Sequence, residues 1–432
     1  MSSDPVLIIG AGLAGLSAAR TLNEAGVDFL VLEREQEVGG LCRTEKTGGF
    51  AFDYTGHLLH LRPGFARDLI MSELGDLLVE HERKASVYLD DTFVPYPIQA
   101  NFGVLAPSLV DRCVDGYRRS RDVPVSEDMN FAQWSSAQFG DGLAQLFMVP
   151  YNRKLYVHPL EEMEISWTSW SVPRPSEEEM EKAAMGRASG TFGYNATFYY
   201  PKQGGIEVLP GKLAEGLRDR ILTSAGVESV DAAKGTVTVP GGKEIGFSRI
   251  ISTIPLPELL RITSGLPAGH ASAVDRLRYS SVTALCLGFD RPSPREEHWV
   301  YFPEEAFPFY RAGYFTNFSR DLAPEGASSL YVEVAHRMDD QPRVDHLMEE
   351  CLEGLRAARM LESGSRLVAS TVLSMPYAYV FYDQYRKEKL PGLLEDLRTR
   401  SIHSIGRYGA WEYSAMQDAI EQGARTAGEI IS

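Results

Sequence analysis

The N-terminal part of the chain alternates between short apolar runs and a segment of helical composition. Val6–Ile9 is continuously apolar, which is typical of a strand buried on both faces of a sheet. Residues 14–24 have helical composition, and Gly26 follows where a helix would end. A second apolar run, Phe29–Leu32, ends on Glu33. The pattern predicts a strand, a helix and a second strand in that order.

The rest of the chain changes between helical and strand-like patterns. Residues 102–165 carry helical periodicity, whereas residues 280–335 alternate strongly between apolar and polar positions, as in an antiparallel sheet. Residues 86–94 also alternate and are predicted to form one strand. Another strand is predicted at 227–239, and a final helix at 416–430.

Three glycines between the first predicted strand and helix have the spacing of a nucleotide-binding turn. Gly10, Gly12 and Gly15 form G-x-G-x-x-G. The first glycine permits the tight turn, the second lets a pyrophosphate approach the backbone, and the third lets helix and strand pack closely. The helix N-terminus would face the phosphates with free N–H groups, and Glu33 would accept hydrogen bonds from a ribose hydroxyl. A glycine-rich turn without function is the alternative.

A second glycine-rich turn selects the dinucleotide. Gly39 and Gly40 follow Glu33, and Arg43 lies just beyond them. This order is similar to the FAD-binding start of the amine-oxidase and mutase flavoproteins, whereas NAD dehydrogenases usually lack the second turn. FAD is therefore the predicted cofactor, with Val227 near its adenine. For Arg43 the alternative is a surface salt bridge.

These patterns together predict an α/β fold built from three parts. The first is a discontinuous Rossmann-like FAD-binding domain of the glutathione-reductase type. The second is an inserted, mainly helical domain, and the third is a substrate domain built on an antiparallel β-sheet. The predicted boundaries are 1–65, 200–262 and 395–432 for the first part, 100–195 for the second, and 83–99 and 275–385 for the third.

Composition excludes several classes of partner. The net charge of −16 and the isoelectric point near 5.1 argue against nucleic acid or an anionic membrane. No apolar run approaches the roughly 18 residues of a membrane span. The first strand begins within a few residues, which leaves no room for a signal peptide, so a cytoplasmic location is expected. The four cysteines are far apart and the nine histidines do not cluster, so no metal site is expected.

Two further segments suggest chemistry beside the flavin. Aromatic and apolar residues frame a turn at Gly56-His57, where glycine would let the backbone approach the flavin ring and histidine could respond to its redox state. A buried histidine bonded to backbone is the alternative for His57. Pro95-Tyr96-Pro97 is a stiff extended segment that would hold Gln99 in a fixed direction.

With these pieces placed, the chain resembles the UDP-galactopyranose mutase family, and within it the eukaryotic-type branch. The resemblance covers most of the length. It implies an enzyme that converts a nucleotide-linked sugar between pyranose and furanose rings with no net redox change. Such an enzyme needs reduced FAD, whose N5 is the nucleophile, and NAD(P)H is a candidate reductant. The segments that carry the resemblance are His81-Glu-Arg83, VPYPIQANF (94–102), LFMVPYNRKLYVHP (146–159), YNATFYYPKQGG (194–205), VYFPEEAFPFYRAGYFTNFS (300–319) and GRYGAWEY (406–413).

The resemblance also implies roles for single residues. Gly56 and His57 match the mobile turn beside flavin N5, and Arg407 matches an arginine that contacts FAD. Tyr301 and Arg311 match residues that hold the substrate diphosphate. Arginine suits a leaving diphosphate because it can meet two oxygens at once. A structural ion pair is the alternative for Arg311, and strand packing for the tyrosines. The other matched substrate positions are Gln99, Tyr156 (a tryptophan in the family), Asn195, Tyr379 and Tyr413.

Three positions depart from the family pattern. Phe318 stands where the family has a tyrosine, and Ser171 where it has an arginine, with Arg174 nearby as a substitute. Met416-Gln417 lies near a position that is asparagine in the family. The nucleotide end of the site is therefore expected to differ from the family's.

Two other functions stay open. The first is a flavin oxidase or dehydrogenase of the amine-oxidase and protoporphyrinogen-oxidase type, and the second is a flavin-bearing binding protein without catalysis. Convergence of Tyr301, Arg311, Tyr379 and Tyr413 on one pocket would favour a diphosphate site, whereas an apolar tunnel or aromatic cage would favour oxidation. The sugar, the base, the reductant and the oligomeric state are not determined by the sequence.

Overall fold

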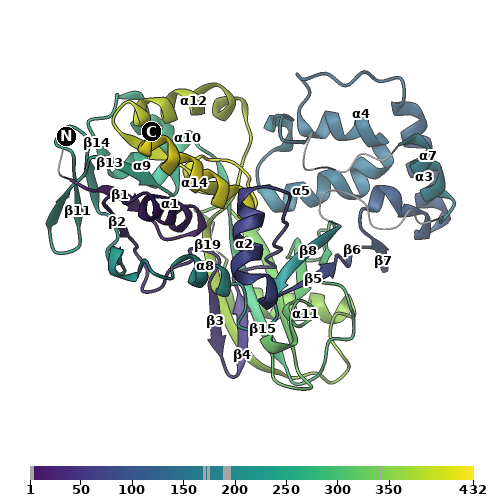
Figure 1. Cartoon of the computed structure of the whole chain (residues 1–432). Coiled ribbons are helices and arrows are strands. Elements are labelled where there is room, and N and C mark those ends of the chain that lie inside the picture. The colour runs from purple at the N-terminus through teal and green to yellow at the C-terminus, as the bar shows by residue number, and fades with distance from the viewer. Residues whose placement is uncertain (1–3, 169–171, 173–175, 188–195, 341) are drawn as a thin grey trace.

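The computed structural model describes residues 4–168, 172, 176–187, 196–340 and 342–432. Figure 1 shows three parts: a layered α/β part that contains α1 and α14, a group of helices around α3 and α4, and a large sheet beneath them. The α/β fold class predicted from the sequence is confirmed, whereas the exact domain boundaries stay a prediction. In the described part of the chain, no helix is both long and apolar enough to cross a membrane.

The α/β part is organised around a five-stranded parallel sheet in the order β20-β13-β1-β2-β9. β1 lies in its centre, paired with β2 and β13, and all four of its residues are buried. This explains why its sequence is apolar without alternation. The strands are β1 (Val6–Ile9), β2 (Phe29–Leu32), β9 (Ile221–Leu222), β13 (Arg249–Ser252) and β20 (Ile402–Ser404), and α1 (Leu13–Glu24) joins β1 to β2.

A smaller four-stranded sheet, β12-β11-β10-β14, accompanies the parallel sheet. The single strand predicted at 227–239 is wrong, because the chain turns between β10 and β11. The Asp231 side chain accepts hydrogen bonds from the N–H groups of Ala233 and Lys234, and Gly235 takes φ +72°. The elements are β10 (Ser229–Asp231), β11 (Thr236–Val239), β12 (Lys243–Gly246), β14 (Thr263–Ser264), α9 (Leu256–Ile262) and α10 (Gly269–Arg276).

The large sheet has seven strands in the order β19-β15-β18-β17-β16-β6-β7. It is antiparallel, as predicted, except for one parallel pair, β6 with β16. The strands are β6 (Ala85–Leu89), β7 (Thr92–Pro95), β15 (Tyr279–Phe289), β16 (Trp299–Tyr301), β17 (Arg311–Tyr314), β18 (Ser328–His336) and β19 (Leu367–Val380), and α11 (Val344–Ala357) packs beside them.

The single strand predicted at 86–94 is wrong, because β6 and β7 form a hairpin. Asp90 and Asp91 occupy the turn with φ angles of 50° and 57°. Positive φ at both central residues is characteristic of the tight hairpin turn that matches strand twist, and aspartate tolerates it better than most residues. Apolar and polar positions alternate on both sides of the turn, so the pattern alone does not show where the first strand ends.

The helical part contains α3 (Pro107–Ser120), α4 (Phe131–Leu143), α5 (Val149–Tyr156) and α7 (Glu177–Ala184), with one π-helical turn, Ala144–Met148, between α4 and α5. α4 begins with a capping box, in which Asn130 and Gln133 each accept a hydrogen bond from the other's backbone N–H.

Several further helices and two short strand pairs complete these parts. The helices are α2 (Phe65–Leu74), α8 (Val208–Leu213), α12 (Gln384–Arg398) and α13 (Gly406–Gly409). The strand pairs are β3 (Thr44–Thr47) with β4 (Phe50–Asp53), and β5 (Leu78–Glu82) with β8 (Thr197–Pro201).

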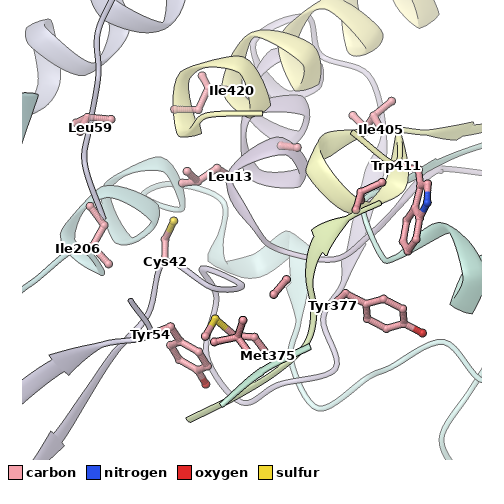
Figure 2. Close-up of a cluster of buried hydrophobic side chains, with 14 of the residues drawn as sticks. Leu13, Cys42, Tyr54, Leu59, Ile206, Met375, Tyr377, Ile405, Trp411 and Ile420 are labelled. Atoms are coloured by element: carbon pink, nitrogen blue, oxygen red, sulfur yellow. The ribbon is translucent and has the colours of Figure 1, made fainter. Parts of the chain in front are cut away.

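The last helix, α14 (Met416–Ile431), returns to the first and packs along α1 (Figure 1). Ile420 of α14 and Leu13 of α1 belong to the buried cluster of Figure 2, and the Ser17 hydroxyl donates to the carbonyl of Ile420 at 2.7 Å. The helices approach closely at Gly423, where a Cβ atom would lie 2.1 Å from the carbonyl oxygen of Ala14. The two ends of the chain are thus joined at the position where α1 begins.

We therefore expect Gly423→Ala to destabilise the protein by about 1–3 kcal/mol, because the added methyl group overpacks the α1–α14 contact. Gly428→Ala is a matched control in the same helix, since nothing lies within 4 Å of its Cβ position. It should stabilise the protein by about 0.5–1 kcal/mol through helix propensity. Chemical denaturation of both variants checks this, and equal effects would show that the close approach is absent.

Candidate active site

One large cavity of about 1620 Å³ lies where the three parts of the molecule meet. Its walls come from the β1–α1 turn, the segment around His57, α5, the β16–β17 hairpin, β19 and the start of α14. It brings together residues that are far apart in the sequence. Of the predicted site residues it is lined by Gly10, Gly12, Glu33, Gly40, Arg43, Gly56, His57, Gln99, Tyr156, Val227, Tyr301, Arg311, Tyr379, Arg407 and Tyr413.

Among the described residues, Gly15 is a predicted cofactor-binding residue that does not line the cavity. Gly15 lies behind the turn, where a Cβ atom would be 2.0 Å from the carbonyl oxygen of Gly10. This close contact is the helix–strand packing that was expected of the third glycine. Asn195, Ser171 and Arg174 fall outside the described residues.

The dinucleotide end of the cavity is formed by the start of α1. Gly12 is the N-cap residue, and no atom lies within 4 Å of the position its Cβ would take. The N-terminal N–H groups of α1 therefore face open space, as a site for an anionic pyrophosphate requires.

Glu33 does more than the ribose contact predicted for it. Its Oε2 accepts a hydrogen bond from Ala11 N at 2.6 Å, and its Oε1 accepts one from Glu35 N at 2.9 Å. The carboxylate is buried and joins the first glycine-rich turn at Ala11 to the segment that follows β2 at Glu35. Each oxygen keeps lone-pair capacity for a ribose hydroxyl.

Arg43 is a cavity residue rather than a surface one. Its Nη2 donates to the Tyr54 hydroxyl at 2.7 Å, and its Nη1 donates to Glu35 at 3.3 Å. Its Nε is buried and has no protein partner among the described residues. The same holds for Nδ1 of His57. These two orphaned atoms, the open cradle at Gly12 and the position of Glu33 fit FAD, whose pyrophosphate the start of α1 would hold.

His57 carries no charge at neutral pH. Burial, followed by the positive charge of Arg311, lowers the pKa of His57 to about 4. The turn before it rests on Tyr331 of β18, because a Cβ at Gly56 would lie 2.3 Å from the Tyr331 hydroxyl. On the other side of the same ring, a Cβ at Gly313 would lie 2.5 Å away. Both glycines make room for one tyrosine, a contact that the sequence did not reveal.

Arg311 is held by a carboxylate that sequence reasoning missed. Its Nε and Nη2 donate to the two oxygens of Glu333 at 2.7 and 2.8 Å, and Glu333 is 0% exposed. The ion pair considered as an alternative for Arg311 is therefore present, and a ligand would meet its Nη1 edge. The signal was available: Glu333 stands between two valines of β18, shares one strand face with Tyr331, and lies directly across from β17.

Tyrosines surround this ion pair. The rings of Tyr151 and Tyr301 are 5.1 Å apart, and those of Tyr310 and Tyr379 are 6.2 Å apart. Burial raises the pKa of Tyr301, and it raises the pKa of Tyr379 to about 12. Their hydroxyls therefore remain neutral hydrogen-bond donors. Tyr151 and Tyr310 were not predicted, although Tyr310 directly precedes Arg311.

Arg407 is a second, half-buried cation of the cavity. It donates through Nη1 to the carbonyl of Ser414 at 2.9 Å and through Nη2 to the carbonyl of Ala378 at 3.3 Å. Its guanidinium carbon lies 4.3 Å from the centre of the Tyr413 ring. These contacts fix Arg407 and Tyr413 as a unit in the same wall.

Phe318 does not alter the cavity, contrary to the expectation drawn from its missing hydroxyl. It is 1% exposed, packs against Phe198, Tyr200 and His298, and does not line the cavity. Gln417 is also buried, and its side chain accepts a hydrogen bond from Arg62 N at 2.6 Å. In the part of the chain that the structure describes, no group of three His, Cys, Asp or Glu side chains could hold a metal ion.

Known proteins resemble this chain in both sequence and structure. The family profile described as flavin containing amine oxidoreductase matches residues 13–431. A crystal structure of reduced UDP-galactopyranose mutase superimposes with a TM-score of 0.94 at 30% identity, covering 99% of this chain and 96% of that one.

Curated relatives are oxidoreductase-like. Lysine-specific histone demethylase 1 homolog 2 of Arabidopsis thaliana is 29% identical over 66% of this chain, and probable polyamine oxidase 4 of the same plant is 25% identical over 72%. The matches span 38% and 63% of the length of these relatives.

We expect Gly12→Val to yield a folded but colourless protein, because the side chain enters the open cradle without meeting protein atoms and blocks the pyrophosphate. Flavin absorbance per mole of purified protein measures the loss, and circular dichroism checks the fold. Full retention of flavin would contradict this assignment of the cofactor site.

Proposed function

Since the chain belongs to the flavin containing amine oxidoreductase family, we propose that it is an FAD-dependent nucleotide-sugar mutase that interconverts pyranose and furanose rings. The observation that carries the proposal is the guanidinium of Arg311, fixed by Glu333 and surrounded by neutral tyrosine hydroxyls in the cavity that fits FAD. The 30% identity to UDP-galactopyranose mutase over nearly the whole chain supports the same assignment.

The residues of this chain would bind and orient the substrate. Reduced FAD, when bound, supplies the nucleophile through N5. The Nη1 edge of Arg311 meets a diphosphate oxygen, where negative charge grows as the diphosphate leaves the sugar. Tyr301 and Tyr379 add donors without adding charge. The neutral His57 and the backbone of Gly56 lie at the flavin end, where they can exchange hydrogen bonds with the ring as its protonation changes.

An amine oxidase is the second candidate, favoured by the curated relatives and by the aromatic lining. Charge argues against it. An amine substrate is a cation before oxidation. Arg311 and Glu333 compensate each other's charge, whereas Arg407 donates to the backbone carbonyls of Ser414 and Ala378 and has no ion pair among the described residues, so its guanidinium charge faces the cavity. A cation would be repelled, whereas a diphosphate would be attracted.

NAD(P)H remains a hypothesis for the reductant, without support from the cavity or the relatives.

The proposal predicts that activity depends on the redox state of the enzyme. The dithionite-reduced protein should convert a nucleotide sugar such as UDP-galactopyranose many times per reductant consumed, because the reaction is redox-neutral. The oxidised protein should be inactive, because oxidised N5 is not nucleophilic. Chromatographic separation of products from a panel of nucleotide sugars measures both.

The amine-oxidase function predicts the opposite pattern. Activity would then come from the oxidised protein, with one O₂ or other acceptor consumed per product. Stoichiometric acceptor consumption with amine or porphyrinogen substrates, together with no ring interconversion by the reduced protein, would refute the mutase proposal.

Arg311→Lys should keep FAD but weaken the binding of UDP-galactopyranose by about 1.5–3 kcal/mol, because lysine retains the charge and loses the planar fork. A lysine also leaves one oxygen of the buried Glu333 without its present donor, so the free energy of unfolding should fall as well. Calorimetric titration measures the affinity. Arg20→Lys is the matched control, since Arg20 pairs with Glu73 away from the cavity. Equal affinity in Arg311→Lys and the parent would remove Arg311 from the substrate site.

A further inference from the structure

Lys154 of α5 makes an unusual set of contacts. Its Nζ donates hydrogen bonds to three backbone carbonyls, those of Phe302 at 2.8 Å, Glu304 at 3.0 Å and Phe309 at 2.6 Å. An ammonium group has three N–H donors, so these three carbonyls use all of them. All three belong to one segment, the turn between β16 and β17.

The turn needs such a donor on its apolar side, which is packed away from water, whereas Glu305 and Ala306 at its tip are exposed. Phe302 and Phe309 are fully buried and Phe307 nearly so, and their rings contact one another at 4.7–5.7 Å. Buried carbonyls without donors are costly. Phe302 N pairs with Tyr310 O, and Tyr310 N pairs with Glu333 O, whereas the Glu304 carbonyl accepts a hydrogen bond from Phe307 N at 3.3 Å. Lys154 therefore supplies a charged donor to the carbonyls of Phe302 and Phe309 and a second donor to that of Glu304.

The same turn carries two residues of the cavity at its ends. Tyr301 is the last residue of β16 and Arg311 the first of β17, and they are direct cross-strand partners. On the other side of the Lys154 contact, α5 carries Tyr151 and Tyr156 into the cavity. The Tyr151 ring meets the Tyr301 ring edge-on at 5.1 Å. The lysine therefore joins the two elements whose separation sets the distance between these side chains.

We propose that Lys154 is a positioning residue of the active site: its ammonium clamps the 302–310 turn to α5 and thereby sets Tyr301 and Arg311 against Tyr151. Lys154 itself does not line the cavity. The clamp acts across the junction between the helical part and the large sheet, so it fixes the width of the cavity between them. Its consequence for substrate binding rests on the function proposed above, whereas its effect on the turn does not.

Charged groups around the clamp determine how it should be tested. Burial lowers the pKa of Lys154 to about 7, while Glu304, Glu305 and Cys351 nearby favour the charged form. The experiments are therefore run at pH 6, where the form with three N–H donors predominates.

Hydrogen exchange of the holoprotein tests the clamp without any substrate. In Lys154→Met, amides in peptides that cover 302–310 should exchange about tenfold faster or more than in the parent, because a charged hydrogen-bond donor is lost. Peptides from β1 and α1 should be unchanged. Lys154→Gln keeps two N–H donors, so the exchange rate of its 302–310 peptides should lie between those of the parent and Lys154→Met. Lys182→Met is the matched control, since Lys182 is an exposed lysine of the same helical part that pairs with Glu178. Unchanged exchange of the turn in both Lys154 variants would overturn the proposal.

Ligand affinity then separates positioning from general stability. UDP-galactopyranose should bind Lys154→Met about tenfold more weakly at full FAD content, because displacement of catalytic or binding groups by a fraction of an ångström is costly. Lys154→Arg, which restores a multi-donor cation, should recover part of that loss. Faster exchange of the turn with unchanged affinity would overturn the positioning role. Absence of binding in the parent protein, with the exchange effect intact, would instead refute the proposed function and leave the clamp itself supported.

Discussion

The buried ion pair between Arg311 and Glu333 is the interaction on which the cavity depends. Glu333 lies inside an apolar strand and is fully removed from water, and such a carboxylate is tolerated only with a well-placed cation. The pair fixes the guanidinium at two of its nitrogens, so its remaining edge has a defined direction. Because the charges of Arg311 and Glu333 compensate each other, the pair adds little net charge to the cavity, while the free edge of the guanidinium remains a directed hydrogen-bond donor.

The electrostatics of the neighbouring side chains follow from this arrangement. The positive charge of Arg311 adds to burial in keeping His57 neutral, and burial keeps the tyrosine hydroxyls protonated. Hydrogen-bond donors are therefore abundant around the cavity. Such a lining suits an anionic ligand whose charge increases during a reaction, because the donors are already oriented before that charge appears.

Features that lie within one continuous segment could be predicted from the sequence, whereas contacts between residues that are distant in the sequence could not. Gly10, Gly12 and Glu33 were found because the nucleotide-binding turn is a continuous segment with a fixed spacing. Glu333 was missed because its meaning depends on the strand beside it, and Lys154 because its acceptors are backbone carbonyls about 150 residues away. Phe318 was misread because a missing hydroxyl matters only where the side chain faces the cavity. The turn at Asp90-Asp91 was hidden by alternation that continued through it.

The ring of Tyr331 links two glycines that are far apart in the sequence. Gly56 and Gly313 each face it at a distance that leaves no space for a methyl group. The three positions therefore form one steric unit and are not free to change independently during evolution. A relative that has a larger residue at the position of Gly56 must have a smaller ring or none at the position of Tyr331, or else its Gly-His turn must follow another path; at the position of Gly313 the backbone carbonyl of His298 excludes a Cβ as well. Covariation between the positions of Gly56 and Tyr331 would thus mark the relatives that share this contact.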